Sequence, residues 1–154
     1  MTIHRLLYRS DMDLIGTEAV IGQQVTEIVR LSAERNAAHG LTGALLYTRG
    51  VFIQALEGAL PALEETFERI CRDLRHRRVE LLEFAQADTR LFGEWAMVRI
   101  SAGHALQAYM PSLATLTEQT SEAVSAPATI HLMRSMLVAE SISKSQAERG
   151  VASK

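Results

Sequence analysis

Residues 41–58, which read LTGALLYTRGVFIQALEG, decide the fold. They contain two apolar runs, 41–48 and 51–57, and the pair Arg49-Gly50 between them is typical of a short hairpin connection. Strands joined by so short a turn pair in antiparallel fashion. The sequence therefore predicts a β-hairpin here.

The second strand of this hairpin, 51–57, carries apolar side chains on both of its faces. Val51 and Ile53 point to one face, and Phe52 and Leu56 point to the other. A sheet that is apolar on both sides needs cover on both sides. We therefore expect a layer of helices on one face, and cover on the other face from the C-terminal residues or from a second subunit.

Outward from the hairpin, periodicity predicts the remaining elements. Strands are expected at 2–10, 79–87 and 95–101, and helices at 20–39 and from Pro61 to His76. The resulting order is β-α-β-β-α-β plus one further strand. This order predicts an α+β fold of the ferredoxin-like type, with both helices on one face of a mixed or antiparallel sheet.

The C-terminal third is expected to be helical and then disordered. Candidate helices at 104–120 and 127–142 would pack on the other face of the sheet or on a partner. The small polar residues of 143–154 predict a disordered tail. We thus expect a folded domain over 1–101, a helical extension over 102–142 and the tail.

The composition is that of one globular domain. The chain has 154 residues, of which 47% are hydrophobic and 22% charged, enough to bury a single core without disulfide or metal staples. Lys and Arg total 16 against 18 Asp and Glu, a formal charge of −2. This near-neutral charge removes the general electrostatic argument for nucleic acid or an anionic membrane as a partner.

Residue usage excludes several kinds of site. The single cysteine rules out an internal disulfide framework and a multi-cysteine zinc site. No apolar run approaches the roughly 20 residues required to cross a bilayer, and the first residues lack the features of a secretion signal. We expect a soluble, cytoplasmic protein with no metal site, no membrane association and no direct nucleic-acid partner.

Polar side chains occur where the pattern predicts core. Gln54 lies between Phe52 and Leu56, and Tyr8 points inward from the first strand. A buried amide without partners costs roughly 1–3 kcal/mol. In isolation such residues are more often structural than functional, and Arg75 at the expected end of a helix has a helix-dipole explanation.

Taken together, these residues predict a narrow pocket for a flat ring. Two helices, each offering an isoleucine, would hold an apolar ring between them, while Asn36, Gln54 and Arg75 address its polar edge and Tyr8 lies behind Gln54. A planar heterocycle with carbonyls and an imide N–H suits this arrangement. Neither G-x-G-x-x-G nor the P-loop pattern is present, so a nucleotide would not be bound in Rossmann fashion.

At these positions the sequence resembles the BLUF domain, an FAD-binding sensor of blue light, over about residues 2–100. The matching segments are Leu7-Tyr8-Arg9-Ser10, Arg35-Asn36 with residues 40–47, residues 50–58, Asp73-Leu74-Arg75-His76 and Phe92-Gly93-Glu94-Trp95-Ala96-Met97. Their order and spacing together are highly specific, whereas any one segment alone is weak.

The resemblance implies a role for each matching residue. Tyr8 would be the photochemical electron and proton donor, Gln54 the amide between this phenol and the flavin, and Trp95 and Met97 on the fifth strand would relay the signal. The positions implied to bind FAD are Ile28, Ser32, Asn36, Phe52, Gln54, Ile70, Asp73, Arg75 and His76. Arg35 stands where other members often carry Asn or His, and the resemblance assigns it no contact.

Within this set the resemblance is specific about four contacts. Asn36 would bind the C4 carbonyl and N3–H edge of the flavin, and Arg75 would reach its C2 carbonyl side. Ile28 and Ile70 would clamp the ring. Because the ring makes most of these contacts, the residues alone do not separate FAD from FMN or riboflavin.

The resemblance implies a blue-light photoreceptor, not an enzyme, whose red-shifted signalling state passes to a protein partner or through a homo-oligomer. One alternative is a small ferredoxin-like regulatory or interaction module without photochemistry, which would be colourless. Another is an acyl-phosphate hydrolase that uses an Arg and an Asn, but no nucleophile–base pair stands out in the sequence.

Overall fold

The computed structural model describes residues 2–12, 14–48, 50–73, 75–100 and 126–151. The chain forms two compact units, Met1–Ala102 and Gly103–Lys154. Of the elements in these described residues, the sheet and two helices belong to the first unit, and a helix near the C-terminus belongs to the second.

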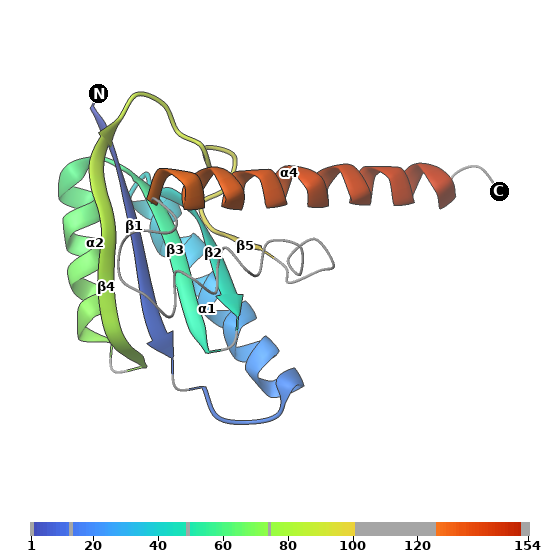
Figure 1. Ribbon diagram of the computed structural model, residues 1–154, viewed down its shortest axis with the longest axis horizontal. Coiled ribbons are helices and arrows are strands. Elements are labelled where there is room, and N and C mark those ends of the chain that lie inside the picture. The colour runs from blue at the N-terminus through green and yellow to red at the C-terminus, as the bar shows by residue number, and fades with distance from the viewer. Residues whose placement is uncertain (1, 13, 49, 74, 101–125, 152–154) are drawn as a thin grey trace. The chain divides into compact units, whose positions relative to one another are not determined.

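The first unit contains one five-stranded sheet (Figure 1). Its elements are β1 (Ile3–Met12), α1 (Glu18–Ala38), β2 (Thr42–Thr48), β3 (Val51–Gly58), α2 (Leu60–Arg72), β4 (His76–Ala87) and β5 (Val98–Ile100). The strand order is β4-β1-β3-β2-β5, with β5 parallel to β2 and the other pairs antiparallel. The predicted α+β, ferredoxin-like fold with an additional strand is confirmed.

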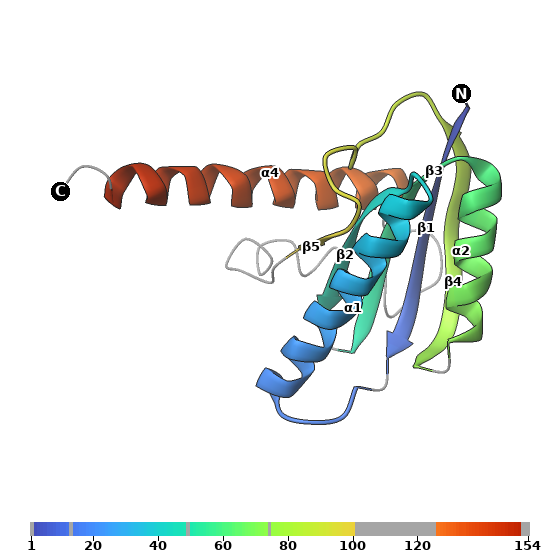
Figure 2. The same cartoon turned by 180° about the vertical axis from the view of Figure 1, so that it is seen from behind.

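Both helices of this unit lie on the same face of the sheet, and Figure 2 shows them in front of it. α1 packs against β2 and β5, whereas α2 packs against β1, β3 and β4. The two helices therefore divide the sheet between them, and the boundary falls where β2 meets β3.

The core lies between this face and the helices. Leu6, Leu45 and Leu56 of the sheet cluster with Val25 of α1 and Leu63 of α2, and all of them are buried. Burying a side chain of this size contributes roughly 1.5–3 kcal/mol. This cluster fixes both helices against the sheet.

The opposite face of the sheet is also apolar and buried. Leu7, Leu46, Ile53 and Ala55 are at most 1% exposed, and strand alternation places them away from the helices. The expectation of apolar side chains on both faces is met. Cover of this face by C-terminal helices stays a prediction, and the expected helix at 104–120 lies outside the described residues.

The second unit contains α4 (Ala126–Val151). Ile130, Met133 and Leu137 are buried and share one side of it. The prediction of a disordered tail is wrong for residues 143–151, which belong to α4. This stretch holds strong helix formers and no proline. Residues 152–154 lie outside the described part.

Among the helices of the described residues, none is long and apolar enough to cross a bilayer.

α2 ends at Arg72, four residues before the expected end at His76. Asp73 follows it, and the backbone N–H of Asp73 still donates to Ile70 O at 3.1 Å. The Asp73 carboxylate then accepts the backbone N–H of Arg75 at 3.0 Å, a local bond that competes with further helix. His76 begins β4, so the helix-dipole explanation for Arg75 does not apply.

β5 is shorter than the expected strand at 95–101. The Trp95 N–H donates to Phe92 O and the Trp95 carbonyl accepts from Gly43 N, both at 3.0 Å. The first of these bonds is local and bends the chain, so regular pairing with β2 starts only at Val98. Trp95 and Met97 therefore lie in the segment before β5 and not on it.

Candidate cofactor site

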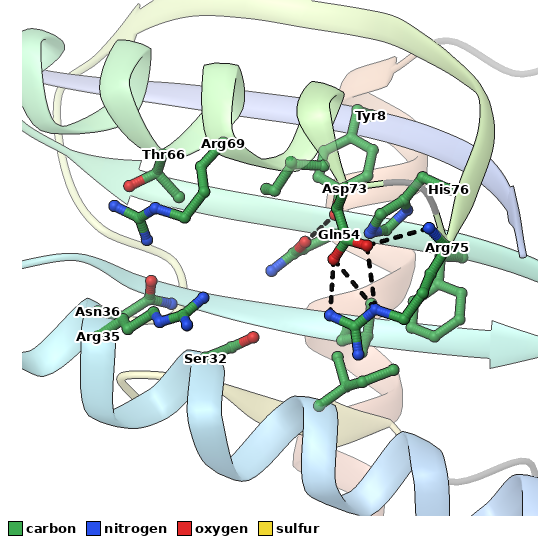
Figure 3. A pocket seen from close by; sticks show the side chains of 14 residues that line it. Tyr8, Ser32, Arg35, Asn36, Gln54, Thr66, Arg69, Asp73, Arg75 and His76 are labelled. Atoms are coloured by element: carbon green, nitrogen blue, oxygen red, sulfur yellow. Dashed lines mark hydrogen bonds and ion pairs between the residues drawn. The ribbon is translucent and has the colours of Figure 1, made fainter.

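A pocket lies between α1 and α2 on the helix-covered face of the sheet (Figure 3). The empty space between its lining residues is about 600 Å³, part of it open to solvent. β1, β2 and β3 supply the floor, and the walls come from α1, α2 and the residues just after α2.

The structure brings the predicted cofactor-binding residues together in this pocket. Its lining includes Tyr8, Ile28, Ser32, Asn36, Phe52, Gln54, Ile70, Asp73, Arg75 and His76. Trp95 and Met97 are not part of the lining. The shared location is an observation, whereas the role of each residue toward a cofactor stays a prediction.

Tyr8 and Gln54 form the polar part of the floor. They lie directly opposite each other in the β1–β3 pairing, and the Tyr8 hydroxyl donates to Gln54 Oε1. Burial, with smaller contributions from Asp73 and Cys71, raises the pKa of the Tyr8 phenol well above its usual range. Tyr8 is therefore neutral and keeps its proton at any physiological pH.

The other end of the Gln54 amide contacts Met97. Gln54 Nε2 donates to Met97 Sδ at 3.7 Å, and Met97 is 7% exposed. A thioether is a weak acceptor, so this bond is easily exchanged for a better one. Trp95, the other predicted relay residue, is half-buried.

One side of α1 forms a wall of the pocket. Ile28, Ser32 and Asn36 follow each other at intervals of four, as expected for one helix face. Asn36 is 3% exposed, and its Nδ2 donates to Ala96 O at 2.7 Å. This bond ties the amide to the segment that carries Met97.

Asp73 and Arg75 form an ion pair at the edge of the pocket. Arg75 Nε and Nη2 donate to the Asp73 carboxylate at 3.0 and 2.6 Å, which lowers the pKa of Asp73 to about 2. Both side chains remain partly exposed, and such pairs contribute only about 0–1 kcal/mol. A ligand carbonyl can therefore redirect the Arg75 guanidinium at small cost.

His76 packs beside the floor. Its Nδ1 lies 2.7 Å from Ser10 Oγ, and its ring centroid is 5.9 Å from that of Phe52 and 6.2 Å from that of Tyr8. Burial lowers the pKa of His76, partly opposed by the charge of Asp73. The imidazole is therefore largely neutral at neutral pH.

The pocket also contains residues that the sequence analysis did not assign. They are Arg35, Leu45, Thr66 and Arg69. Thr66 lies four positions before Ile70, so the helical spacing around that isoleucine would have found it, whereas Arg69, one position before Ile70, does not follow that spacing. Leu45 pairs with Gln54 across the β2–β3 hairpin.

A buried carboxylate holds the segment that leads to Met97. Glu57 is 0% exposed and accepts from Leu91 N at 2.7 Å, Phe92 N at 2.8 Å and Arg5 Nε at 2.9 Å. The signal for this role in the sequence is an acidic residue at the end of an apolar strand. Within the described part of the chain, no His, Cys, Asp and Glu residues cluster to hold a metal.

With this geometry in place, comparison with known proteins identifies the family. The model of the family described as "Sensors of blue-light using FAD" matches residues 3–98. The chain belongs to the BLUF family. The predicted family, the blue-light sensing function and FAD as the cofactor are confirmed, and this favours the photoreceptor over both alternatives.

Two curated relatives illustrate the range of BLUF proteins. The photoactivated adenylate cyclase subunit beta of Euglena gracilis is 33% identical over 96 residues, 62% of this chain and 11% of the relative. The blue light- and temperature-regulated antirepressor BluF of Escherichia coli is 33% identical over 92 residues, 60% of this chain and 22% of the relative. The chain thus matches only a small part of each.

Solved structures share the fold. The dark-state structure of BlrB, a BLUF protein, has a TM-score of 0.71 and 29% identity, covering 90% of this chain and 97% of that one. A bacterial light-regulated adenylyl cyclase has a TM-score of 0.66 and 28% identity, covering 75% of this chain and 34% of that one. These likenesses agree with the sheet and helices of the first unit.

Proposed function

We propose that this chain senses blue light through a flavin held in the pocket between α1 and α2, and that Tyr8 and Gln54 carry the photochemistry. The observation that supports this most strongly is the buried hydrogen bond from the Tyr8 phenol to Gln54 on the floor of that pocket. A neutral phenol in contact with a two-ended amide is an electron and proton donor next to a group that can reorient.

The remaining lining fits a flavin ring. Ile28 and Ile70 come from opposite helices and would pack against the two faces of the ring. Asn36 would bind the C4 carbonyl and N3–H edge, and Arg75, released from Asp73, would bind the C2 carbonyl. Ser32, Phe52, Asp73 and His76 would complete the enclosure.

When bound, the flavin supplies the absorption of blue light and an excited state that accepts an electron. Tyr8 gives up one electron, and its hydroxyl proton leaves along the hydrogen bond to Gln54. Both then return to Tyr8, so no substrate is consumed and the chain is not an enzyme. Gln54 is left with its donor and acceptor ends exchanged by rotation or tautomerisation.

The signal starts from a small free-energy change. A neutral hydrogen bond contributes about 0.5–1.5 kcal/mol, so Gln54 can only bias a nearly balanced element. The nearest such element is the segment that holds Trp95 and Met97, because Met97 accepts from Gln54 and Ala96 accepts from Asn36. We infer that this segment is the relay.

The output then passes to a partner protein or to another copy of the chain. Named relatives include an adenylate cyclase subunit and an antirepressor, and those activities belong to the relatives. The effector of this chain, its homo-oligomeric state and its cytoplasmic location stay predictions.

Tyr8→Phe tests the donor assignment. The variant loses the phenolic proton but keeps the ring, so it should bind flavin as the wild type does and show no red shift of its absorption after blue illumination. Tyr47→Phe is the matched control, since Tyr47 packs on Phe52 outside the pocket lining. A normal photocycle in Tyr8→Phe would refute the donor assignment.

A further inference from the structure

Two arginines, Arg35 of α1 and Arg69 of α2, line one end of the pocket from opposite helices. Figure 3 shows both guanidinium groups at the end that also holds Asn36 and Thr66, away from the Asp73–Arg75 pair. Neither arginine has a role in the proposed photochemistry. The proposed function therefore does not explain why both arginines lie at this end of the pocket.

The charge at this end is not balanced by nearby carboxylates. Among the described residues, none forms an ion pair with the Arg35 guanidinium. Arg69 lies 3.8 Å from Glu65 on the exposed surface of α2, and this is its one ion pair within the described ranges. Arg75, in contrast, is paired with Asp73 within the pocket. The Arg35–Arg69 end therefore presents two cations to whatever enters.

The position of these cations matches the part of a flavin that leaves the pocket. Gln54 and Asn36 are buried, whereas Arg35 is exposed and Arg69 half-buried, so the arginines stand nearer the mouth. A flavin whose N5 edge faces Gln54 directs N10 the other way, because these atoms lie on opposite sides of the central ring. The ribityl chain on N10 then runs toward the mouth.

We propose that Arg35 and Arg69 bind the phosphate at the end of this ribityl chain and make the site selective for FMN and FAD over riboflavin, an inference that rests on the proposed function. Guanidinium groups bind phosphate oxygens through paired, charge-assisted hydrogen bonds. Riboflavin carries the same ring and ribityl chain but lacks the phosphate, so it gains nothing from this pair.

Titration of the full chain, freed of its flavin, with riboflavin, FMN and FAD tests the proposal. Flavin fluorescence reports binding to the wild type, Arg35→Gln, Arg69→Gln and the double variant. In the wild type at low salt, FMN and FAD should bind about tenfold or more tightly than riboflavin. Each single variant should lose most of this preference, the double variant should lose all of it, and riboflavin affinity should stay constant.

Arg72→Gln is the matched control, since Arg72 lies on α2, pairs with Glu68 at 2.6 Å and is absent from the pocket lining. It should leave all three affinities unchanged. Constant riboflavin binding also shows that each variant is folded. Added salt should weaken FMN binding more than riboflavin binding, because charge pairs near the mouth are screened.

Other outcomes overturn the proposal in distinguishable ways. Equal wild-type affinities for the three flavins, or equal losses for all three in the variants, would mean that the arginines contact the ring or nothing at all. A gain for FAD without one for FMN would place the contact beyond the first phosphate. No binding of any flavin to the wild type would contradict the proposed function itself.

Discussion

At the scale of single residues, the site depends on an amide with two different neighbours. Gln54 accepts from the Tyr8 phenol at one end and donates to the Met97 thioether at the other. Exchange of the ends presents a donor to Tyr8 and an acceptor toward Met97, which has no proton to give. The amide is therefore bistable only if a further partner, such as a flavin carbonyl, compensates for the lost bond.

Replacing Gln54 tests this reading. Gln54→Leu keeps the approximate volume and removes both hydrogen-bonding ends, so the protein should still bind flavin and turn yellow but lose the light-induced red shift. Difference absorption spectra before and after illumination measure the shift. Gln86→Leu on the exposed surface of β4 should behave as the wild type. Retention of the full shift in Gln54→Leu would argue against the amide switch.

His76 gives the molecule a defined pH dependence. Burial lowers the pKa of the folded-state imidazole below its usual 6.5, so below about pH 6.5 the unfolded chain takes up a proton that the folded chain resists. Stability should therefore fall between pH 7.5 and 5.5, and urea unfolding at several pH values measures it. Asp73, with its pKa near 2, acts only at lower pH.

His76→Gln should flatten this dependence, because the group that titrates is then gone. His131→Gln, at an exposed position on α4, should leave the slope as it is in the wild type. An equal slope in the His76 variant and the wild type would contradict the assignment.

At the scale of elements, the proposed signal path runs through the long connection between β4 and β5, which has little regular structure. The buried Glu57 carboxylate fixes its Leu91 and Phe92 amides, while the Ala96 carbonyl and Met97 thioether meet Asn36 and Gln54. The segment is thus held at one end and bonded to the switch at the other. In the proposed mechanism, such an arrangement would transmit a change at Gln54 without moving the sheet.

Glu57→Leu should destabilise the fold by about 3 kcal/mol, because the Leu91 and Phe92 amides and the Arg5 guanidinium lose the carboxylate that accepts from them. Urea denaturation measures the loss, and Glu64→Leu on the exposed surface of α2 should change stability by less than about 0.5 kcal/mol. A stability loss in Glu57→Leu no larger than that of the control would show that the carboxylate does not anchor this segment.

The elements also show which parts of the structure could be predicted from the sequence. Helical spacing and strand alternation are local, so Ile28, Asn36 and Gln54 could be placed on the correct faces of their elements. The end of α2 at Arg72 and the bend at Trp95 could not be read from periodicity. The first depends on the hydrogen bond of the Asp73 side chain to a neighbouring backbone amide, and the second on the local bond from the Trp95 N–H to Phe92.

At the scale of the whole molecule, the chain combines a BLUF unit with a helix whose one side is buried. Periodicity predicted the fold, and the order and spacing of the motifs carried the resemblance to the BLUF family, which implied FAD. The contacts of Glu57 with Leu91 and Phe92, and the meeting of Arg35 and Arg69, join residues more than thirty positions apart. Only the folded chain shows such pairs.

The central claim is that the pocket between α1 and α2 holds a flavin that drives a reversible change at Tyr8 and Gln54. Absorption spectra of this chain with FAD, taken before, during and after blue illumination, test it most directly. We predict a bound-flavin spectrum that shifts to longer wavelength in the light and returns in the dark. A protein that takes up no flavin, or a bound flavin whose spectrum does not respond to light, would contradict the claim.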